Sequence, residues 1–398
     1  MKKILNGLAI FLLCLGLGLG AVCVSSVLAP QSESLEPIRT VEEPGKEQSD
    51  IEEEPPVEED PEEEGHTAEK SAEEPSADSL AYSLLDEETK TVYAQMLDTL
   101  ENHAEETDLP TTDEEVLPRA FEALTSDHGE IFWVSGYQYV KESLGGQTVR
   151  IRFLPSYTMT QDEREDYQAQ VDRALSPFLY GTGEDDSDYE KVKTIYENLS
   201  LNVKYNPDAV ENQNILSVFL GGQSVCNGIA AAAQYLLSRL DVPCMIVYGD
   251  AGGESHAWNL VMIEGDPYLM DATWGNNAAA ALGACSYEYL NLTNADLAAT
   301  HTADMDLELP VCVKTEFNYY VQEGLFFETF EEDAAGAALR RCSEEGGRQL
   351  GLRFGSSEAY GQARQALVAD SRIAEYCPDI TSFRYMENEN LHVLTLSW

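Results

Sequence analysis

The sequence predicts an α+β protein in which a helix packs on an antiparallel sheet. Three observations support this fold class. Apolar residues recur at helical spacing over several stretches, most clearly at 80–100 and 226–240. Other stretches, such as 242–247 and 256–263, have the composition of strands. Paired glycines separate two strand-like runs near residue 145, which predicts a hairpin.

The first 29 residues have the features of a leader segment. Lys2 and Lys3 precede an uncharged, mostly apolar run from Ile4 to Leu28, and Ala29 ends an acceptable cleavage site. Signal peptides carry about 7–15 apolar residues and a membrane span about 20, so a cleaved signal peptide and an uncleaved anchor both stay open. A lipid-modified Cys23 is a third interpretation, although the residues before it match that motif poorly. All three place the body outside the cytoplasm, at the cell surface or secreted, with membrane contact only through this segment.

Residues 30–78 predict a disordered acidic linker. The stretch is rich in glutamate and proline and has almost no apolar residues, so it cannot bury enough surface to offset the entropy of ordering. Repulsion between its like charges keeps such a chain extended. We expect it to hold the body away from a membrane or wall.

Net charge restricts the partners of the chain. Lys+Arg number 24 and Asp+Glu 72, which gives a formal charge of −48. A surface this acidic repels phosphate backbones, so we expect no nucleic acid partner.

Eight cysteines are present, six of them after the leader. If Cys226 is a free thiol, the remaining five cannot all pair, which excludes a complete disulfide framework. One disulfide among Cys312, Cys342 and Cys377 stays open.

Three regions follow the linker. Residues 79–184 predict helices at 80–100, 113–124 and 160–178, with a hairpin at 137–154. Residues 185–305 predict the following elements: a helix at 188–199, a strand at 201–205, a loop or short helix at 212–220, a helix from 226, strands at 242–247, 256–263 and 267–272, then loop and short helix.

Residues 306–398 predict a small α+β accessory domain. The expected elements are a strand–turn–strand at 318–330, a helix at 331–344, a strand at 348–354, helices at 357–369 and 372–377, and a last hairpin. The chain has no internal repeat, no GxGxxG, P-loop or HExxH motif, and no calcium-loop pattern. We therefore expect no cofactor and no metal.

The chemistry concentrates in residues 221–276. Cys226 follows a Gly-Gly turn and begins a helix, where unpaired N–H groups and the helix dipole favour a thiolate. His256 opens one predicted strand and Asp271 ends the next, so the two can be neighbours in an antiparallel sheet. A thiol, an imidazole and a carboxylate are the parts of a nucleophile–base–orienter triad.

The sequence around these residues resembles the transglutaminase-like superfamily. The matching motifs are SVCNGIA at Cys226, HAWN at His256 and YLMDATWGN at Asp271, and the resemblance covers residues 190–300. It implies a papain-like core in which Cys226 is the nucleophile, His256 the general base and acid, and Asp271 the orienting carboxylate. Papain-type peptidases place the histidine about 130 or more residues after the cysteine, so the order and spacing here disfavour papain itself.

Four other residues are candidates near the site. Animal transglutaminases have a tryptophan upstream of the cysteine that binds the oxyanion, and no tryptophan lies between Trp133 and Trp258 here. Gln223 or Tyr205 could serve instead. Trp258 and Trp274 flank the histidine and the aspartate and are expected to wall the site. Asn259 is a candidate for a hydrogen bond near the triad, or for one in the core.

These features predict an extracytoplasmic cysteine enzyme that transfers an acyl group from a peptide or glutamine amide through a thioester. Hydrolysis is the preferred outcome, with a protein or a cell-wall peptide as substrate, because bacterial members of the superfamily are often thought to be proteases or wall hydrolases. Protein cross-linking by transamidation is one alternative. The other is a non-catalytic surface module, since some superfamily members keep the fold without the triad.

Overall fold

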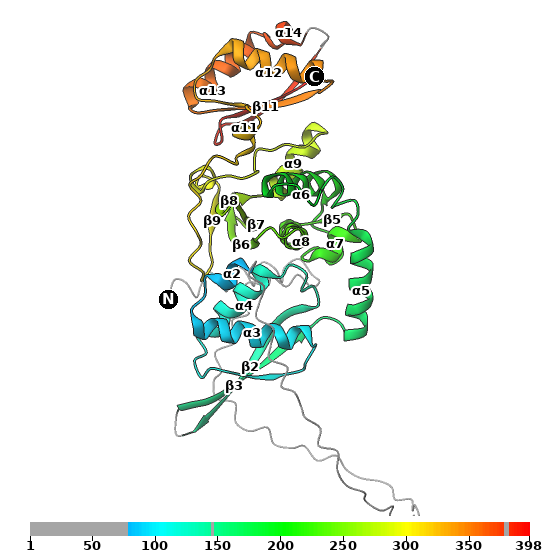
Figure 1. Cartoon of the computed structure of the whole chain (residues 1–398), viewed down its shortest axis with the longest axis vertical. Helices are drawn as coiled ribbons and strands as arrows, with labels where there is room; N and C mark the ends of the chain where they lie inside the picture. The colour runs from blue at the N-terminus through cyan, green and yellow to red at the C-terminus, as the bar shows by residue number, and fades with distance from the viewer. Residues whose placement is uncertain (1–78, 145–146, 378–381) are drawn as a thin grey trace, which may run out of the picture.

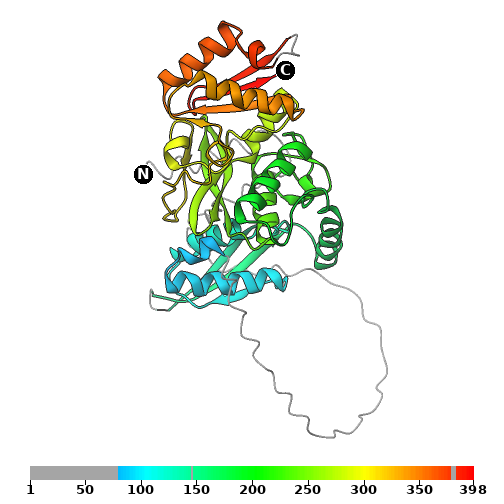
Figure 2. The ribbon, with the colours of Figure 1, turned by 45° about the horizontal axis from the view of Figure 1, so that its top comes forward.

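The computed structural model describes residues 79–144, 147–377 and 382–398. The predicted leader (1–29) and acidic linker (30–78) lie outside the described residues. Figures 1 and 2 show three layers in a row, with the N-terminal elements at one end, residues 185–305 in the middle and the C-terminal elements at the other end. No helix in the described part of the chain combines the length and the hydropathy that crossing a membrane requires.

The first layer is a three-stranded sheet covered by helices. Its strand order is β1-β3-β2, and both pairings are antiparallel. The elements are α2 (Leu80–Ser83), α3 (Glu87–Glu101), β1 (Thr107–Leu109), α4 (Val116–Asp127), β2 (Val134–Leu144) and β3 (Gln147–Tyr157). The predicted hairpin is confirmed. The predicted helix at 113–124 begins three residues later, because Thr111 and Asp113 accept backbone hydrogen bonds in the preceding turn.

The middle layer is a four-stranded antiparallel sheet with α8 packed on β6 and β7. Its order is β8-β7-β6-β9. The elements are α5 (Gln161–Ala174), α6 (Asp188–Asn202), β4 (Lys204–Tyr205), α7 (Ile215–Phe219), β5 (Gln223–Ser224), α8 (Cys226–Ser238), β6 (Cys244–Ala251), β7 (Glu254–Ile263), β8 (Asp266–Met270), α9 (Ala272–Leu282), α10 (Asn294–Leu297) and β9 (His301–Ala303).

Sequence composition explains this packing. The helix α8 is rich in alanine and buries Ile229, Leu236 and Leu237 against the sheet. The strand β7 is central and is buried from Ala257 to Val261 without the alternation of a half-exposed strand. The predicted helix-on-antiparallel-sheet fold is therefore confirmed.

Two predicted strands of this layer differ in their bounds, and two further elements were missed. The expected strand at 201–205 is shortened to β4, because α6 continues to Asn202 and includes the first two residues of that stretch. The strand β7 begins at Glu254, so His256 lies two residues inside it rather than at its start. The helix α9 and the strand β9 were not predicted.

The last layer is a second four-stranded sheet of order β10-β11-β13-β12 with helices on it. The elements are α11 (Tyr319–Gln322), β10 (Phe326–Phe327), α12 (Glu332–Glu344), β11 (Gln349–Phe354), α13 (Ser357–Arg364), the π-helical turn η1 (Gln365–Ala369), α14 (Ile373–Tyr376), β12 (Arg384–Asn388) and β13 (Val393–Ser397). The predicted strand at 318–322 is instead the helical turn α11, since the Asn318 side chain accepts from the N–H of Tyr320.

Candidate active site

Cys226 is the first residue of α8, as the sequence predicts, and its side chain is half-exposed. Its neighbours hold the start of the helix against the loop at 212–214. The Ser224 hydroxyl donates to the Asn212 carbonyl (2.9 Å), and the Asn227 amide donates to the Gln213 carbonyl (2.6 Å). A Cβ at Gly228 would lie 2.1 Å from Ser224 Oγ, so only glycine allows this close approach. The thiol is therefore fixed at the positive end of a thirteen-residue helix.

His256 and Asp271 meet across the sheet. Nε2 of His256, on β7, lies 2.8 Å from Oδ2 of Asp271, which directly follows β8. The antiparallel register that pairs Asn259 with Met270 brings the two side chains together. The Cys226 thiol is near enough to the same imidazole to raise its pKa. Since Nε2 faces the carboxylate, Nδ1 is the ring atom left for the thiol.

The electrostatics of the pair favour a charged ring. Burial disfavours the imidazolium, but the Asp271 carboxylate and the Cys226 side chain outweigh it and raise the pKa of His256 above its usual value. Burial also opposes the Asp271 carboxylate, yet His256 and a hydrogen bond from His301 lower the pKa of Asp271. These opposite shifts are those of an ion pair inside a closed site.

Asp271 is held by more than the triad. Its Oδ1 accepts from the backbone N–H groups of Thr273 (2.8 Å) and Trp274 (3.0 Å), so the residue also caps α9. Its Oδ2 lies 3.2 Å from Nε2 of His301, the first residue of β9. Sequence reasoning missed His301 because it stands in no motif. The only local signal is a lone histidine at the end of a loop-like stretch.

The two predicted wall residues lie against the triad. The Trp258 ring stacks at 6.1 Å from the His256 ring, and the Trp274 ring lies 6.2 Å from it, measured between centroids. Asn259 lies elsewhere. Its amide donates to the Ala230 carbonyl (2.9 Å) and ties α8 to the sheet, because alternate residues of a strand point to opposite faces. The core alternative for Asn259 is therefore the correct one.

Both oxyanion candidates lie beside Cys226. The short strands β4 and β5 run parallel and pair Tyr205 with Ser224. The Asn206 amide donates to Gln223 Oε1 (2.9 Å), so the oxygen of this side chain is engaged and its N–H₂ group is the part that can donate to a substrate. Burial and the nearby charges of Cys226, Glu254 and Asp271 raise the pKa of Tyr205.

The cluster could also be considered as a metal site. His256, Asp271 and His301 each offer one ligand atom, and these atoms lie within 4.8 Å of one another. Tetrahedral ligands at zinc bond lengths stand roughly 3.3 Å apart. The 2.8 Å contact between His256 and Asp271 is shorter than that and is typical of a hydrogen bond between charged groups. The geometry fits a hydrogen-bonded cluster.

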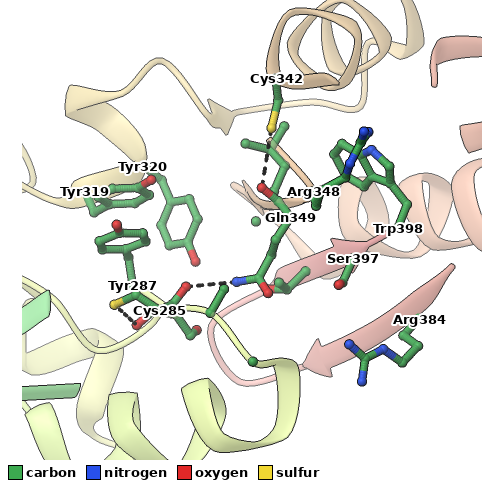
Figure 3. A pocket seen from close by; sticks show the side chains of 16 residues that line it. Cys285, Tyr287, Tyr319, Tyr320, Cys342, Arg348, Gln349, Arg384, Ser397 and Trp398 are labelled. Atoms are coloured by element: carbon green, nitrogen blue, oxygen red, sulfur yellow. Dashed lines mark hydrogen bonds between the residues drawn. The ribbon is translucent and has the colours of Figure 1, made fainter. Parts of the chain in front are cut away.

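All six cysteines in the described residues are free thiols, so the pairing left open among Cys312, Cys342 and Cys377 is not formed. Apart from Cys226, two of the remaining thiols line a cavity of about 600 Å³ between the middle and last layers, shown in Figure 3. Burial raises the pKa of Cys285 there to about 12 and also raises the pKa of Cys342. Raised pKa values make these thiols poor nucleophiles.

A family model and several solved structures match the chain. The model of the transglutaminase-like superfamily matches residues 178–274. One matching structure is described as a "TGase"; it has 13% sequence identity and a TM-score of 0.26, over 35% of this chain and 44% of that one. No curated protein matches.

Two other matching structures come from bacteria. A "Putative Cysteine Protease from Cytophaga hutchinsonii" has 15% identity and a TM-score of 0.23, over 34% of this chain and 62% of its own. A "putative protease" from Parabacteroides distasonis ATCC 8503 has 11% identity and a TM-score of 0.21, over 33% and 35%. The chain thus spans less than two thirds of the length of each structure.

Cys226, His256 and Asp271 all fall inside the range that the family model matches. The same range contains α8, β6, β7 and β8, which are the helix and strands that bring these three side chains together. Residues 178–274 form a domain of the transglutaminase-like superfamily.

Proposed function

We propose that this protein is a cysteine acyl-transfer enzyme with Cys226 as nucleophile, His256 as general base and acid, and Asp271 as the orienting carboxylate. The observation that carries the proposal is the shared imidazole. Nε2 of His256 lies 2.8 Å from Asp271, and the Cys226 side chain acts on the same ring and helps to raise its pKa. A nucleophile beside a base that is hydrogen-bonded to an orienting carboxylate is the arrangement that defines such triads.

The reaction begins from an ion pair, in which the Cys226 thiol has already given its proton to His256. The thiolate attacks the carbonyl carbon of a peptide or glutamine amide and forms a tetrahedral intermediate. The C–N bond then breaks as His256 gives its proton to the leaving amine, which leaves an acyl thioester on Cys226. Water or a primary amine attacks the thioester, His256 takes the proton of the attacking group, and the thiolate leaves.

Stabilisation of the oxyanion comes from two donors in this mechanism. The Cys226 backbone N–H lies at the start of α8, where no intrahelical acceptor is available. The Gln223 amide supplies the second donor, since its oxygen is already occupied by Asn206. Tyr205 is the competing second donor.

Hydrolysis is the proposed outcome, with a peptide or protein as substrate and cell-wall peptide as one class of it. The predicted leader and acidic tether would place the reaction outside the cytoplasm. These assignments rest on the sequence and on the likeness to the superfamily. Incubation with a glutamine-containing peptide library, with and without a primary amine, separates the outcomes, because cleavage, deamidation and cross-linking give different masses.

The wild-type protein should give cleaved or deamidated products, and Cys226→Ala should lower their rate by a factor on the order of 10⁴ or more. Cys342→Ala, which removes another half-exposed thiol, is the matched control and should keep the wild-type rate. Amine-dependent cross-linking without cleavage would replace hydrolysis by transamidation. An active Cys226→Ala protein would contradict the mechanism.

A further inference from the structure

A second imidazole shares the catalytic carboxylate. His301 lies on β9, the edge strand of the middle sheet, and its Nε2 approaches the same Asp271 oxygen that receives His256. We propose that His301 is a positioning residue that fixes the Asp271 carboxylate for His256. The proposal rests on the proposed function and adds to it a residue that stands in none of the motifs.

His301 restrains the carboxylate from the side opposite to the cap. Rotation about Cβ–Cγ moves both oxygens together, and this terminal torsion is broad. Oδ1 is held by the N–H groups of Thr273 and Trp274, at 2.8 and 3.0 Å. The contact of Oδ2 with His301, at 3.2 Å, opposes the same rotation at the other oxygen and helps to keep it 2.8 Å from His256.

His301 is itself oriented. The Thr300 hydroxyl lies 2.8 Å from its Nδ1, and a carboxylate can only accept, so the Nε2 proton must point at Asp271. The Trp274 and Trp258 rings lie 4.7 and 5.1 Å from the imidazole, measured between centroids. The His301 side chain is 1% exposed, so bulk water cannot take over its hydrogen bond.

The arrangement also keeps the charge on the correct residue. Both imidazoles favour an ionised Asp271, and their hydrogen bonds help to lower its pKa against the effect of burial. The Asp271 charge also acts on the tyrosines Tyr196, Tyr205 and Tyr289, and it acts on Cys226 indirectly, by way of His256. A carboxylate that stays ionised stabilises the His256 imidazolium and, with it, the Cys226 thiolate.

Alkylation of Cys226 by iodoacetamide tests the proposal without a known substrate. The full chain is alkylated between pH 4.5 and 9, and the modified cysteines are counted by peptide mass mapping. His301→Phe fills the same space without the N–H group. We expect Cys226 alkylation at pH 6 to fall about tenfold, which is the size expected for a lost hydrogen bond to a charged group. The acid limb of the plot of alkylation rate against pH should move up by about one pH unit, since a tenfold change in thiolate population equals one unit.

Two variants separate positioning from packing. His301→Gln places an amide N–H near the position of Nε2 and should restore most of the wild-type profile. Thr300→Val keeps the imidazole but removes the partner of Nδ1, so it should move the acid limb in the same direction by less. It also keeps the test valid if His301→Phe does not fold. His128→Phe removes a buried imidazole in the first layer and should leave the profile unchanged.

The outcomes are distinct. Equal, slow alkylation of Cys226 and Cys342 in the wild-type protein would overturn the proposed function. Fast wild-type alkylation with an unchanged profile in His301→Phe or Thr300→Val would overturn the role of His301 alone. Dialysis against Zn²⁺ followed by metal analysis is the last measurement. One bound zinc per chain that His301→Phe loses would assign the three residues to a metal instead.

Discussion

The two oxygens of Asp271 have different roles, and substitutions can separate these roles. Oδ1 caps α9 through two backbone N–H groups, and Oδ2 receives His256. Asp271→Asn keeps an oxygen for the cap but loses the charge. We expect the thermal midpoint to stay within a few degrees, while the rate of acyl transfer falls by a factor on the order of 10⁴. Asp271→Ala should show the same loss of rate. Its free energy of unfolding should also fall by about 1 kcal/mol, because the helix cap is missing.

Calorimetry of both variants with single-turnover kinetics measures the two effects. An Asp271→Asn protein that turns over at the wild-type rate would contradict the role of the carboxylate.

The pH dependence of stability follows from the shifts of the same pair. The pKa of Asp271 is lowered from 3.8, so its stabilising contribution is present above pH 3.8 and is lost as pH falls through the lowered value. The pKa of His256 is raised from 6.5, so its contribution is present below pH 6.5 and is lost as pH rises through the raised value. The difference in melting temperature between wild type and Asp271→Asn should therefore be largest between pH 3.8 and 6.5. A difference that grows steadily up to pH 9 would contradict the pairing.

The oxyanion donor can be identified at the residue scale. If Gln223 donates, Gln223→Ala should lower kcat by about 10²–10³ with a small change in KM, because the bond forms only in the transition state. Tyr205→Phe should then be nearly neutral. Steady-state kinetics on one cleavable peptide compares the two variants, and the opposite pattern would assign the donor to Tyr205.

How far the sequence predicts the site depends on whether a residue stands in a motif. Cys226, His256 and Asp271 are predictable because each belongs to a specific motif, and the structure brings them together. His301 is not, since its role depends on β9 pairing with β6, a contact across about fifty residues that no local pattern encodes. Asn259 stands in the HAWN motif as well, yet strand alternation turns it to the core, so a motif alone does not place a residue in the site.

At the scale of elements, long helices with apolar periodicity were predicted well and short elements were not. The helix α12 differs from its prediction by one residue. The turn α11 contains two tyrosines and a valine, a composition that predicts a strand, and its conformation is set by the Asn318 cap. The helix α9 was missed because its start depends on the Asp271 side chain, which the sequence offers equally as a catalytic group.

The contact between α4 and the segment after β9 gives a prediction at this scale. Glu122 on α4 accepts from the Asp306 N–H at 2.8 Å. Burial and the charges of Asp306 and Asp304 outweigh that bond and raise the pKa of Glu122 to about 7. The pKa is raised from 4.5, so the stabilising contribution is present below pH 4.5 and is lost as pH rises through 7.

Glu122→Gln keeps an acceptor oxygen without the charge. Its melting temperature should match that of the wild type at pH 4.5 and exceed it by about 2 °C at pH 8. Differential scanning calorimetry at the two values is the measurement. Glu105→Gln, which removes an exposed carboxylate, is the control and should show no such crossover. A lower melting temperature for Glu122→Gln at pH 8 would contradict a destabilising buried charge.

At the scale of the whole molecule, polar contacts join the last layer to the middle one, and those of Glu288 are buried. The Gln349 amide on β11 donates to the Cys285 carbonyl (2.8 Å), at the edge of the cavity in Figure 3. The Lys193 ammonium on α6 lies 2.7 Å from the Glu323 carboxylate just after α11. Glu288 is 3% exposed, and its carboxylate accepts from Asn388 (2.9 Å) and Thr395 (3.2 Å) of the last sheet. The boundary at residue 306 and an accessory role for residues 306–398 stay predictions.

Thr395→Val tests whether the last layer can loosen without disturbing the site. Valine keeps the shape and the strand preference of threonine but removes one donor from the buried Glu288 carboxylate. Burial already raises the pKa of Glu288, and Thr395 opposes that shift. The loss of stability should therefore be greater at pH 8, where the charged carboxylate must stay buried with one hydrogen bond fewer, than at pH 5. We expect the free energy of unfolding to fall by about 1–3 kcal/mol at pH 8. Hydrogen exchange should become faster in β11, β12 and β13. Exchange in β6 and β7 and the alkylation rate of Cys226 should stay as in the wild type. Thr148→Val on β3 is the control and should change none of these. Faster exchange in β7 to the same degree would instead make the two layers a single cooperative unit.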